Sequence, residues 1–292
     1  MHNKMVDKFN GMDHRSRVLL GMGVLGVCVL CYWAVSYAAG RESTDDAFID
    51  GHVVAISPKV AGHVARVYVT ENEMVKGGQL LFEIDSRDYA VRADLANADL
   101  KAAFAEVRQA GQDAARYRDL LAKKDISAQQ YERSTLRVVT AQAKLDAARA
   151  RLQQADLDLS YTKVRAPEAG QVAQKAVEPG AYVQQGQTLL AIVPAERWIT
   201  ANFKETQMTR IHPGEKVTFS VDAYPGRIFR GRVDSIQHGT GSRFSLLPVE
   251  NATGNYIKVV QRVPVKIVFE DTAGAGQPLA LGMSVLPVVE TN

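Results

Sequence analysis

The chain is poor in the side chains from which redox, metal and catalytic sites are usually built. Only two of its 292 residues are cysteine, Cys28 and Cys31, and both lie in one apolar stretch without charge. The rest of the chain therefore has no thiol for a disulfide or a thiolate metal site. Its six histidines are scattered, and neither a phosphate-binding P-loop nor a G-x-S-x-G nucleophile elbow is present. We expect a protein without catalytic residues, metal ions or cofactors, and not an enzyme.

The charge of the chain is too mild for a protein that binds nucleic acid. The formal net charge is +3, and the Lys and Arg residues are spread along the sequence. No basic stripe interleaved with aromatic residues is present, which such a protein would need to hold phosphates and stack bases. We therefore expect no nucleic-acid partner.

One long apolar run, Val18 to Ala39, has no charged residue. As a helix its 22 residues would cover ~33 Å, enough for a hydrocarbon core of ~30 Å. Four Lys or Arg residues precede the run and acidic residues follow it. The positive-inside rule then places residues 1–17 in the cytoplasm, residues 18–39 across the membrane and the bulk of the chain outside. A cleaved signal peptide is the alternative, but no clean A-x-A cleavage site follows.

One short motif occurs twice, in residues 53–85 and again in residues 164–194. Two glycines sixteen residues apart mark each copy, and five further positions match at the same offset. Short valine-rich segments between turn residues predict a β half-domain in each copy. Two halves so far apart in the sequence share a core only if the intervening chain goes out and returns. The matching residues are Gly62, Val64, Val75, Gly78, Gln79, Leu81 and Ile84, and in the second copy Gly170, Val172, Val183, Gly186, Gln187, Leu189 and Ile192.

The segment between the copies, residues 86–163, repeats with a period of seven. Such a/d seams predict two helices that form an antiparallel coiled-coil hairpin, each arm projecting about 50–60 Å. Ser127 is a good N-cap for the second helix, and Arg165–Ala166–Pro167 is expected to end it. The seam residues are Tyr89, Ala93, Ala96, Leu100, Ala103, Val107, Ala110, Ala114, Tyr117 and Leu121, followed by Val138, Ala141, Leu145, Ala148, Leu152, Ala155 and Leu159.

The C-terminal part, residues 195–292, is expected to be mostly β-strand. A short helix is predicted from Lys204 to Ile211, ended by His212–Pro213–Gly214. Residues 40–52 are expected to form a linker and to add a first strand, so that these segments close a small β-barrel. The other predicted strands are Trp198–Phe203, Glu215–Val221, Ile228–Ile236, Val263–Glu270 and Met283–Glu290.

Several stretches of the sequence carry a family resemblance. Both half-motifs look like halves of the lipoyl/biotinyl fold, and Leu157–Val172 (LDLSYTKVRAPEAGQV) is similar to the start of the second half in one family. That family is the HlyD family of membrane fusion proteins, or periplasmic adaptors. Asn202–Gln207 (NFKETQ) and Gly239–Val265 (GTGSRFSLLPVENATGNYIKVVQRVPV) resemble its EmrA-like branch. The resemblance covers nearly the whole chain, although the hairpin is shorter than this branch implies.

The resemblance implies an elongated fold of mixed α and β structure. It would comprise an N-terminal transmembrane helix, a split lipoyl-like β-sandwich interrupted by the coiled-coil hairpin, and a membrane-proximal β-barrel. It also implies a periplasmic adaptor of a multidrug efflux or secretion system, held in the bacterial inner membrane by a single pass with a cytoplasmic N-terminus. The implied partners are an inner-membrane exporter of the major facilitator superfamily, a TolC-like outer-membrane channel, and further copies of the chain in a trimer or hexamer.

A signature spaced R-x3-L-x6-S stands at the hairpin tip in several branches of this family. Arg116, Leu120 and Ser127 match that spacing. Because Leu121 lies on the predicted seam, Leu120 and Arg116 are expected to point away from it. An exposed Leu beside an Arg is suited to contact the helical ends of a channel. The alternative is a solvated Arg, a Leu at a helix end and a Ser that serves only as N-cap.

Lys204 and Glu205, within the NFKETQ stretch, are candidates for contact with the transporter, or else they begin the short helix. The main alternative function is a biotinyl or lipoyl carrier subunit of a membrane-bound enzyme complex. Such a carrier needs a lysine at the turn between its two halves, whereas here the hairpin replaces that turn. Lys163 lies nearby in the sequence but is expected to be an ordinary surface residue. A membrane-anchored scaffold without a transport role is a weaker alternative.

Overall fold

A computed structural model of the chain describes residues 40–240, 260–270 and 279–291. The chain divides into two compact units, His52–Ala195 and a second unit that combines Met1–Gly51 with Glu196–Asn292. The predicted anchor, residues 18–39, lies outside the described residues. Among those that are described, neither helix is apolar enough over a sufficient length to span a membrane.

The first unit contains a β-sandwich of two four-stranded sheets. Each sheet takes two strands from each half-motif, so neither half could form a closed sandwich alone. One sheet has the order β3 (Val54–Ile56), β10 (Leu190–Val193), β8 (Gly170–Lys175) and β5 (Met74–Val75). The other has the order β7 (Lys163–Arg165), β6 (Leu80–Ile84), β4 (Gly62–Val67) and β9 (Tyr182–Val183).

Main-chain hydrogen bonds between the two half-motifs have equivalents in which the halves have exchanged the roles of donor and acceptor. The Asn72 N–H donates to the Val172 carbonyl at 2.8 Å, and the equivalent Gly180 N–H donates to the Val64 carbonyl at 2.8 Å. The halves therefore hold each other through reciprocal main-chain hydrogen bonds, as an approximate two-fold arrangement requires.

A single hydrophobic core lies between the two sheets. Every apolar position that matches between the half-motifs is buried, with exposed fractions of 2% or less. Burying one such Val, Leu or Ile side chain stabilises a fold by about 1.5–3 kcal/mol. The repeated residues are thus the residues that bring the halves together. They are Val64, Val75, Leu81 and Ile84, with Val172, Val183, Leu189 and Ile192.

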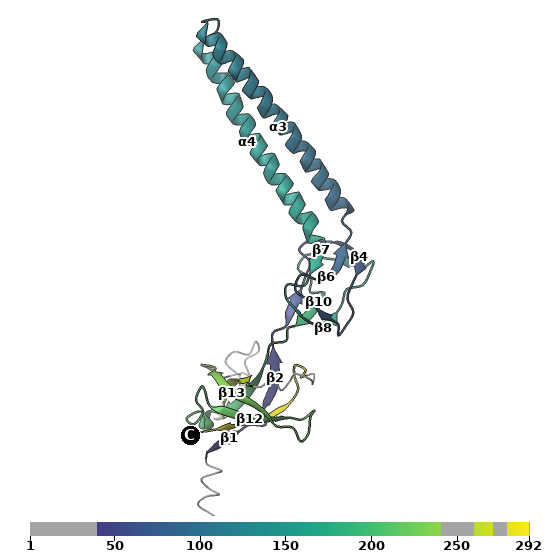
Figure 1. Cartoon of the computed structure of the whole chain (residues 1–292), viewed down its shortest axis with the longest axis vertical. Helices are drawn as coiled ribbons and strands as arrows, with labels where there is room; N and C mark the ends of the chain where they lie inside the picture. The colour runs from purple at the N-terminus through teal and green to yellow at the C-terminus, as the bar shows by residue number, and fades with distance from the viewer. Residues whose placement is uncertain (1–39, 241–259, 271–278, 292) are drawn as a thin grey trace, which may run out of the picture. The chain divides into compact units, whose positions relative to one another are not determined.

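Between the half-motifs, α3 (Arg87–Ala122) and α4 (Ala128–Tyr161) run side by side as an antiparallel hairpin (Figure 1). All of the predicted seam positions are buried or half-buried, while most other positions of both helices are exposed. The Lys144 Nζ atom lies 2.5 Å from Glu106 Oε1 and links the two helices across their surface. The predicted coiled-coil seam is therefore confirmed.

The prediction that Arg165–Ala166–Pro167 ends the second helix is wrong. Helix α4 ends at Tyr161, and Lys163–Arg165 already forms strand β7 beside β6. The Ile84 N–H donates to the Thr162 carbonyl at 2.8 Å, and the Val164 side chain turns into the sandwich core. The free energy gained by joining the sheet and burying Val164 thus exceeds that of one further helical turn. The helix therefore ends well before Pro167.

The second unit is a curled sheet of seven strands, in which all five strands predicted after residue 195 are present. The sheet closes on itself where β2 (Ala47–Gly51) meets residues 282–284. The Ile49 N–H donates to the Met283 carbonyl at 2.9 Å, and the Gly282 N–H donates to the Ile49 carbonyl at 2.8 Å. The strand order is β1 (Arg41–Ser43), β15 (Val285–Glu290), β12 (Lys216–Val221), β13 (Phe229–Ile236), β14 (Arg262–Phe269), β11 (Arg197–Lys204) and β2 (Ala47–Gly51).

The short helix predicted from Lys204 to Ile211 is only one 3-10 turn, η1 (Glu205–Gln207). The Glu205 N–H donates to the Gln261 carbonyl at 2.9 Å, so this segment is held against the residue that precedes the strand Arg262–Phe269. Ile211 is 1% exposed and packs in the barrel core, which draws the chain inward before a regular helix can continue. Packing of one isoleucine and one long-range hydrogen bond therefore override the local helical tendency.

Candidate partner-binding sites

The hairpin tip brings together the three residues that match the family signature. Arg116 and Leu120 lie in the last two turns of α3, and Ser127 directly precedes α4. In the connecting turn Lys124 has a positive φ of 65°, and the Asp125 N–H donates to the Leu120 carbonyl at 3.0 Å. The turn thus folds back on the end of α3 and fixes the tip.

Two of these residues differ in how they are presented to solvent. The Arg116 side chain is 72% exposed and lies 3.5 Å from Asp113 one turn earlier, a surface ion pair that contributes little to stability. Leu120 is half-buried, so the expectation of an exposed leucine is wrong. It lies next to the seam residue Leu121, and the turn that follows packs back against this part of the helix. The contact of these residues with a channel remains a prediction.

Ser127 has the structural role expected from its position. Its hydroxyl accepts from the Gln130 N–H at 3.2 Å, and its own N–H donates to Gln130 Oε1 at 3.0 Å. This reciprocal pair is a capping box, which satisfies two main-chain donors at the start of a helix. Its N-cap role is confirmed, whereas its contact with a partner remains a prediction.

Lys204 and Glu205 lie in the other unit, where β11 passes into η1, and both are exposed. The turn beside them is well anchored. Gln207 Nε2 donates to Glu42 Oε2 at 2.8 Å, and Arg210 Nη1 lies 3.2 Å from Glu42 Oε1. The two candidate residues are therefore held on a firm local support, and their role toward a transporter remains a prediction.

At the base of the hairpin the chain leaves the sandwich through Asp85. This carboxylate accepts from Arg87 Nε at 3.0 Å and Nη2 at 2.5 Å, and from the Arg87 N–H at 3.1 Å. These hydrogen bonds lower the pKa of Asp85 to about 2, because they favour the charged form. In addition, the Tyr89 hydroxyl donates to the Ala61 carbonyl at 2.7 Å. The start of α3 is thus tied to the sandwich by side chains.

Lys163, the lysine nearest to the place where a carrier would hold its cofactor, lies within strand β7. Its cross-strand partner is Glu83 of β6. The connection between β6 and β7 is the whole hairpin, not a tight turn that presents a lysine. The geometry therefore gives no support to a swinging cofactor arm on this residue.

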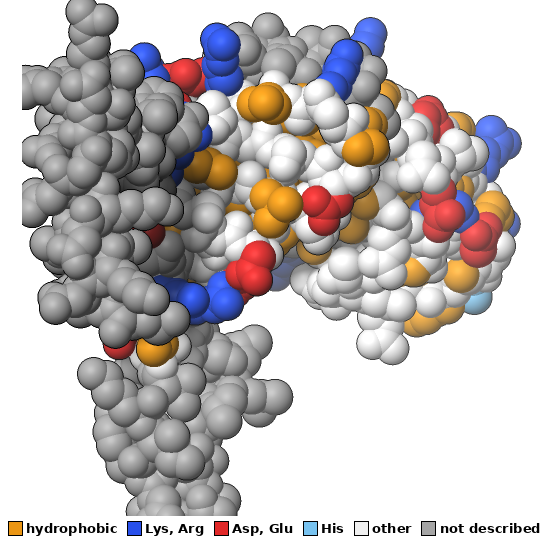
Figure 2. Space-filling model, turned by 90° about the horizontal axis from the view of Figure 1, so that it is seen from below, with side chains coloured by type: hydrophobic (Ala, Val, Ile, Leu, Met, Phe, Trp, Pro, Cys, Tyr) orange, Lys and Arg blue, Asp and Glu red, His pale blue; other side chains and the backbone are white. Residues whose placement is uncertain are grey.

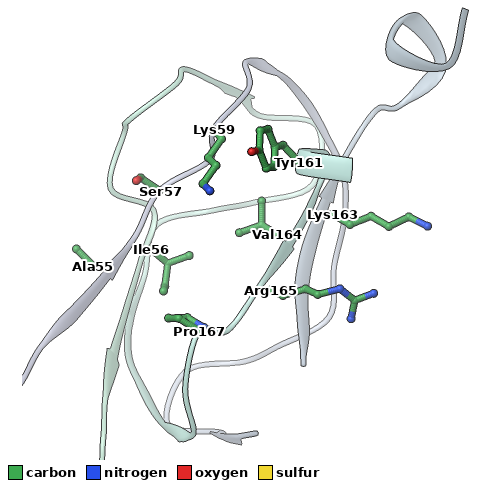
Figure 3. Close-up of a pocket in the computed structure, with 9 residues that line it drawn as sticks. All are labelled: Ala55, Ile56, Ser57, Lys59, Tyr161, Lys163, Val164, Arg165 and Pro167. Atoms are coloured by element: carbon green, nitrogen blue, oxygen red, sulfur yellow. The ribbon is translucent and has the colours of Figure 1, made fainter. Parts of the chain in front are cut away.

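A pocket of about 340 Å³ lies beneath the end of α4, between the edge strands β3 and β7 (Figure 3). The Lys59 and Tyr161 side chains point toward each other over it, with Lys59 Nζ 4.6 Å from the ring centroid, a cation–π contact. Eight of its nine lining residues form four pairs that are related by the offset of the half-motifs. We call this cavity the edge pocket, and its lining consists of Ala55 with Lys163, Ile56 with Val164, Ser57 with Arg165, Lys59 with Pro167, and Tyr161.

The edge pocket and the outer faces of the hairpin were not expected from the sequence. Large apolar side chains are exposed on these outer faces, away from the seam. Apolar residues at helical spacing outside the heptad seam are the sequence signal that could have revealed them, namely Val91 with Leu95 on α3, and Leu136 with Val139 and Leu157 on α4. The large apolar side chains exposed on the hairpin are these five and Phe104.

The described surface shows charges of both signs. On the face in Figure 2, Lys and Arg side chains occur near Asp and Glu side chains, and hydrophobic side chains are spread among polar ones. The pattern agrees with the mild net charge of +3.

Comparison with known proteins gives matches over both units. A family model described as the RND membrane fusion protein barrel-sandwich hybrid domain matches residues 52–195, and a CusB-like beta-barrel domain matches residues 197–242. The colistin resistance protein EmrA of Acinetobacter baumannii is 31% identical, over 89% of this chain and 91% of its own length. The fatty acid resistance protein FarA of Neisseria gonorrhoeae is 35% identical, over 85% and 76%.

Solved structures share the fold at lower sequence identity. The membrane fusion protein Spr0693 of Streptococcus pneumoniae has a TM-score of 0.66 at 17% identity, covering 86% of this chain and 99% of that chain. MacA of Actinobacillus actinomycetemcomitans has a TM-score of 0.61 at 20% identity, with coverage of 87% and 80%. The sandwich, hairpin and barrel thus occur together in other proteins of known structure.

Proposed function

The chain belongs to the EmrA-like membrane fusion proteins, the periplasmic adaptors of efflux systems, and we propose that it joins a major facilitator exporter to a TolC-like outer-membrane channel. The observation that carries this proposal is the hairpin. Helices α3 and α4 have 36 and 34 residues and leave the sandwich at adjacent points on β6 and β7. At ~1.5 Å per residue each helix is about 50 Å long.

A hairpin of this length has little core of its own, because two helices bury only one stripe each. Its stability comes from the seam and from the capped tip, and its outer faces remain available to partners. A projecting element of this kind suits the bridging of two membranes better than the enclosure of a substrate. The tip residues Arg116, Leu120 and Ser127 are the proposed contact with the channel.

The proposed topology follows from the charges around the apolar run. Residues 1–17 are cytoplasmic, residues 18–39 cross the inner membrane once, and the remaining chain is periplasmic. The barrel, residues 195–292 with a first strand from residues 40–52, would then lie next to the membrane, because the chain enters it directly after the anchor. Lys204 and Glu205 on this unit are the proposed transporter contacts.

The chain is proposed to act as a homo-oligomer, a trimer or a hexamer. Support comes from the apolar side chains exposed on the outer faces of the hairpin, among them Leu95 at 64% and Val139 at 64% exposure. On α4, Leu136, Val139 and Leu157 lie three and eighteen residues apart and therefore share one face, and exposed apolar surface of this kind is characteristic of an interface. Copies packed side by side would join their hairpins into a tube above a ring of sandwiches.

No covalent step is assigned to this chain, so the energy for export would come from the partner. A major facilitator exporter couples transport to an ion gradient, and the adaptor would supply only the conduit. The names of two relatives refer to resistance to colistin and to fatty acids. Amphipathic compounds of these two kinds are accordingly the first cargo to test.

Co-purification from mild detergent tests the partnership. The full chain, tagged and expressed in its own host at native level, is expected to carry a major facilitator exporter that mass spectrometry identifies. The Lys204→Glu, Glu205→Lys double variant keeps the net charge and is expected to recover less exporter. Recovery of a different transporter class, or of no transporter under crosslinking conditions, would contradict the proposal.

A further inference from the structure

A charged hollow lies at the end of the barrel where the chain enters it, and we propose that it binds the phosphoethanolamine head group of a membrane phospholipid. The inference rests on the proposed topology, in which the predicted anchor crosses the membrane directly before the barrel. We call this cavity the entry hollow. Its volume is about 740 Å³, and its lining consists of His212, Pro213, Gly214, Glu215, Lys216 and Glu290.

The chain has no free linker between the predicted anchor and the barrel. The apolar run ends directly before Gly40, whose carbonyl accepts from the Thr291 N–H at 2.9 Å. Strand β1 then begins at Arg41, whose cross-strand partner is Glu290. A head-group layer is about 5–8 Å thick, and one residue spans at most about 3.6 Å. In the proposed topology this end of the sheet therefore lies at head-group depth.

Side chains fix strand β1 to the rest of the barrel. The Glu42 side chain is 13% exposed, accepts from Gln207 Nε2 at 2.8 Å and lies 3.2 Å from Arg210 Nη1. Gln207 Nε2 also donates to the Ser43 carbonyl at 3.1 Å. The barrel is thus held at the point where the chain enters it, and the anchor would set its depth.

The entry hollow is at the same end of the sheet as Arg41. Strand β15 pairs with β1 on one side and with β12 on the other, where Val217 lies opposite Val289. Lys216 is one position before this pair on β12, and Glu290 is one position after it on β15. Neighbouring strands are about 4.8 Å apart, so both residues lie within about 10 Å of the point of entry.

One wall of the entry hollow is a turn that is already fixed in shape. The Gly214 N–H donates to the Val233 carbonyl at 2.8 Å, and the Val233 N–H donates to the Glu215 carbonyl at 2.9 Å. The Glu215 side chain is only 10% exposed and accepts from the His212 N–H at 2.9 Å. Glu215 therefore serves the turn, and Glu290 is the carboxylate that the hollow offers to a ligand.

The hollow presents two opposite charges that have no partner of their own. Lys216 and Glu290 are both exposed, and within the described part of the chain neither forms an ion pair. A phosphoethanolamine group carries a phosphate and an ammonium on one short chain, so the phosphate can bind Lys216 while the ammonium binds Glu290. The His212 side chain is 68% exposed at the rim and can donate a further hydrogen bond to the phosphate.

The chemistry of the lining favours a lipid head group over a protein. Protein interfaces are centred on apolar and aromatic side chains that fill pockets. Of the six lining residues, only Pro213 has an apolar side chain that protrudes. A small polar group with both charges fits this lining better than a loop of the exporter, which is the occupant that the experiments below exclude or reveal.

Photocrosslinking tests the site in the full chain. A photoreactive amino acid replaces Pro213, and the protein is reconstituted in vesicles of phosphatidylethanolamine and phosphatidylcholine in equal parts. Adducts with phosphatidylethanolamine are expected in about two- to fivefold excess, the effect of one exposed ion pair, because methylation removes the N–H groups that Glu290 binds. Equal yields of the two adducts, or no lipid adduct, would overturn the inference.

A control position lies at the other end of the same strands. Ile228 directly precedes β13, at the end of β12 away from Lys216, and is 77% exposed. The photoreactive amino acid at Ile228 is expected to give no lipid adduct. An equal lipid yield at both positions would show contact with the bilayer without a site, against the proposal.

Neutral variants in the Pro213 photoreactive chain test the two charges separately. Glu290→Gln is expected to abolish the preference for phosphatidylethanolamine, and Lys216→Gln is expected to lower the yield with both lipids, because both carry the phosphate. Arg227→Gln, an exposed charge at the other end of β12, is the control and should change neither. A preference that persists in Glu290→Gln would contradict the assignment.

Two further measurements separate this inference from the proposed function. In cells, a protein adduct at Pro213 in place of a lipid adduct would assign the hollow to the exporter and overturn the inference. Alkaline carbonate extraction tests the anchor by itself. A chain that resists extraction without preferring phosphatidylethanolamine overturns only the inference, whereas a chain released by carbonate overturns the topology as well.

Discussion

Gly78 and Gly186 occupy the same place in the two halves of the sandwich. The Gly78 N–H donates to the Ala166 carbonyl at 2.7 Å, and the Gly186 N–H donates to the Pro58 carbonyl at 3.0 Å. Each bond joins one half-motif to the other, and both glycines have a left-handed backbone, with φ of 79° and 78°. The repeated glycine therefore marks a reciprocal joint between two segments that are 108 residues apart.

Replacement of either glycine should weaken this joint through the backbone. A Cβ at Gly78 or Gly186 meets nothing within 4 Å, so the cost is that of a left-handed non-glycine residue, about 1–2 kcal/mol. Gly78→Ala and Gly186→Ala are each expected to lower the stability of the full chain by that amount in denaturant unfolding. Gly77→Ala is the control and should change little, since its Cβ would make only ordinary contacts at 3.5 Å or more. Equal losses at Gly77 and Gly78 would contradict the explanation.

Two leucines of α4 should respond differently to truncation. Leu145 is 5% exposed in the seam, whereas Leu157 is 47% exposed on the outer face. Leu145→Ala is expected to cost about 2–3 kcal/mol of hairpin stability, because it removes buried methyl groups and leaves a cavity. Leu157→Ala should leave the stability nearly unchanged but reduce the yield of oligomer in crosslinking. A loss of stability at Leu157 similar to that at Leu145 would show that the outer face is structural.

Substitution at Ser127 separates capping from partner contact. Ser127→Ala removes the side-chain acceptor for the Gln130 N–H and is expected to cost about 1 kcal/mol. Ser127→Asp retains an N-cap acceptor and should preserve stability while changing the surface at the tip. If the tip contacts a channel through Ser127, export falls in Ser127→Asp as well. Full export by Ser127→Asp with reduced export by Ser127→Ala would indicate a purely structural serine.

Acid should loosen the base of the hairpin at Asp85. The pKa of this carboxyl is about 2 in the folded chain, below its ordinary value of 3.8, because Arg87 hydrogen-bonds the charged form. A lowered folded pKa means that the stabilisation is complete above pH 3.8 and is lost as the pH falls through about 2. Hydrogen exchange at the start of α3 should rise over that interval. In Asp85→Asn this rise should be absent, and its persistence there would assign the effect to another group.

Periodic features of the sequence predicted the fold well. The heptad residues are buried or half-buried because a repeat of 3.5 residues places them along one side of each helix. The apolar positions that match between the half-motifs are buried because each half contributes them to the shared core. Patterns of this kind constrain many residues at once. The barrel strands were also found, since alternation between buried and exposed positions is a local signal.

The features that were missed depend on contacts between distant segments. Helix α4 ends at Tyr161 because Thr162 and Val164 join the sandwich, and nothing adjacent to them in the sequence marks that end. Ile211 reduces a predicted helix to one turn by packing in the barrel core. The edge pocket exists only where β3 and β7 face each other across the sandwich. Of the proposed contact residues, Leu120 is half-buried and thus less exposed than expected, and its carbonyl accepts from the Asp125 N–H of the turn that follows.

Removal of the hairpin tests most directly whether this arm is a bridge. The Ile84 N–H donates to the Thr162 carbonyl at 2.8 Å, so a short turn can replace residues 87–161 and leave both sheets in place. The shortened chain, measured in cells for membrane insertion, β-structure and survival on toxic compounds, is expected to insert and fold but to support no export. Export at the level of the intact chain would contradict the account.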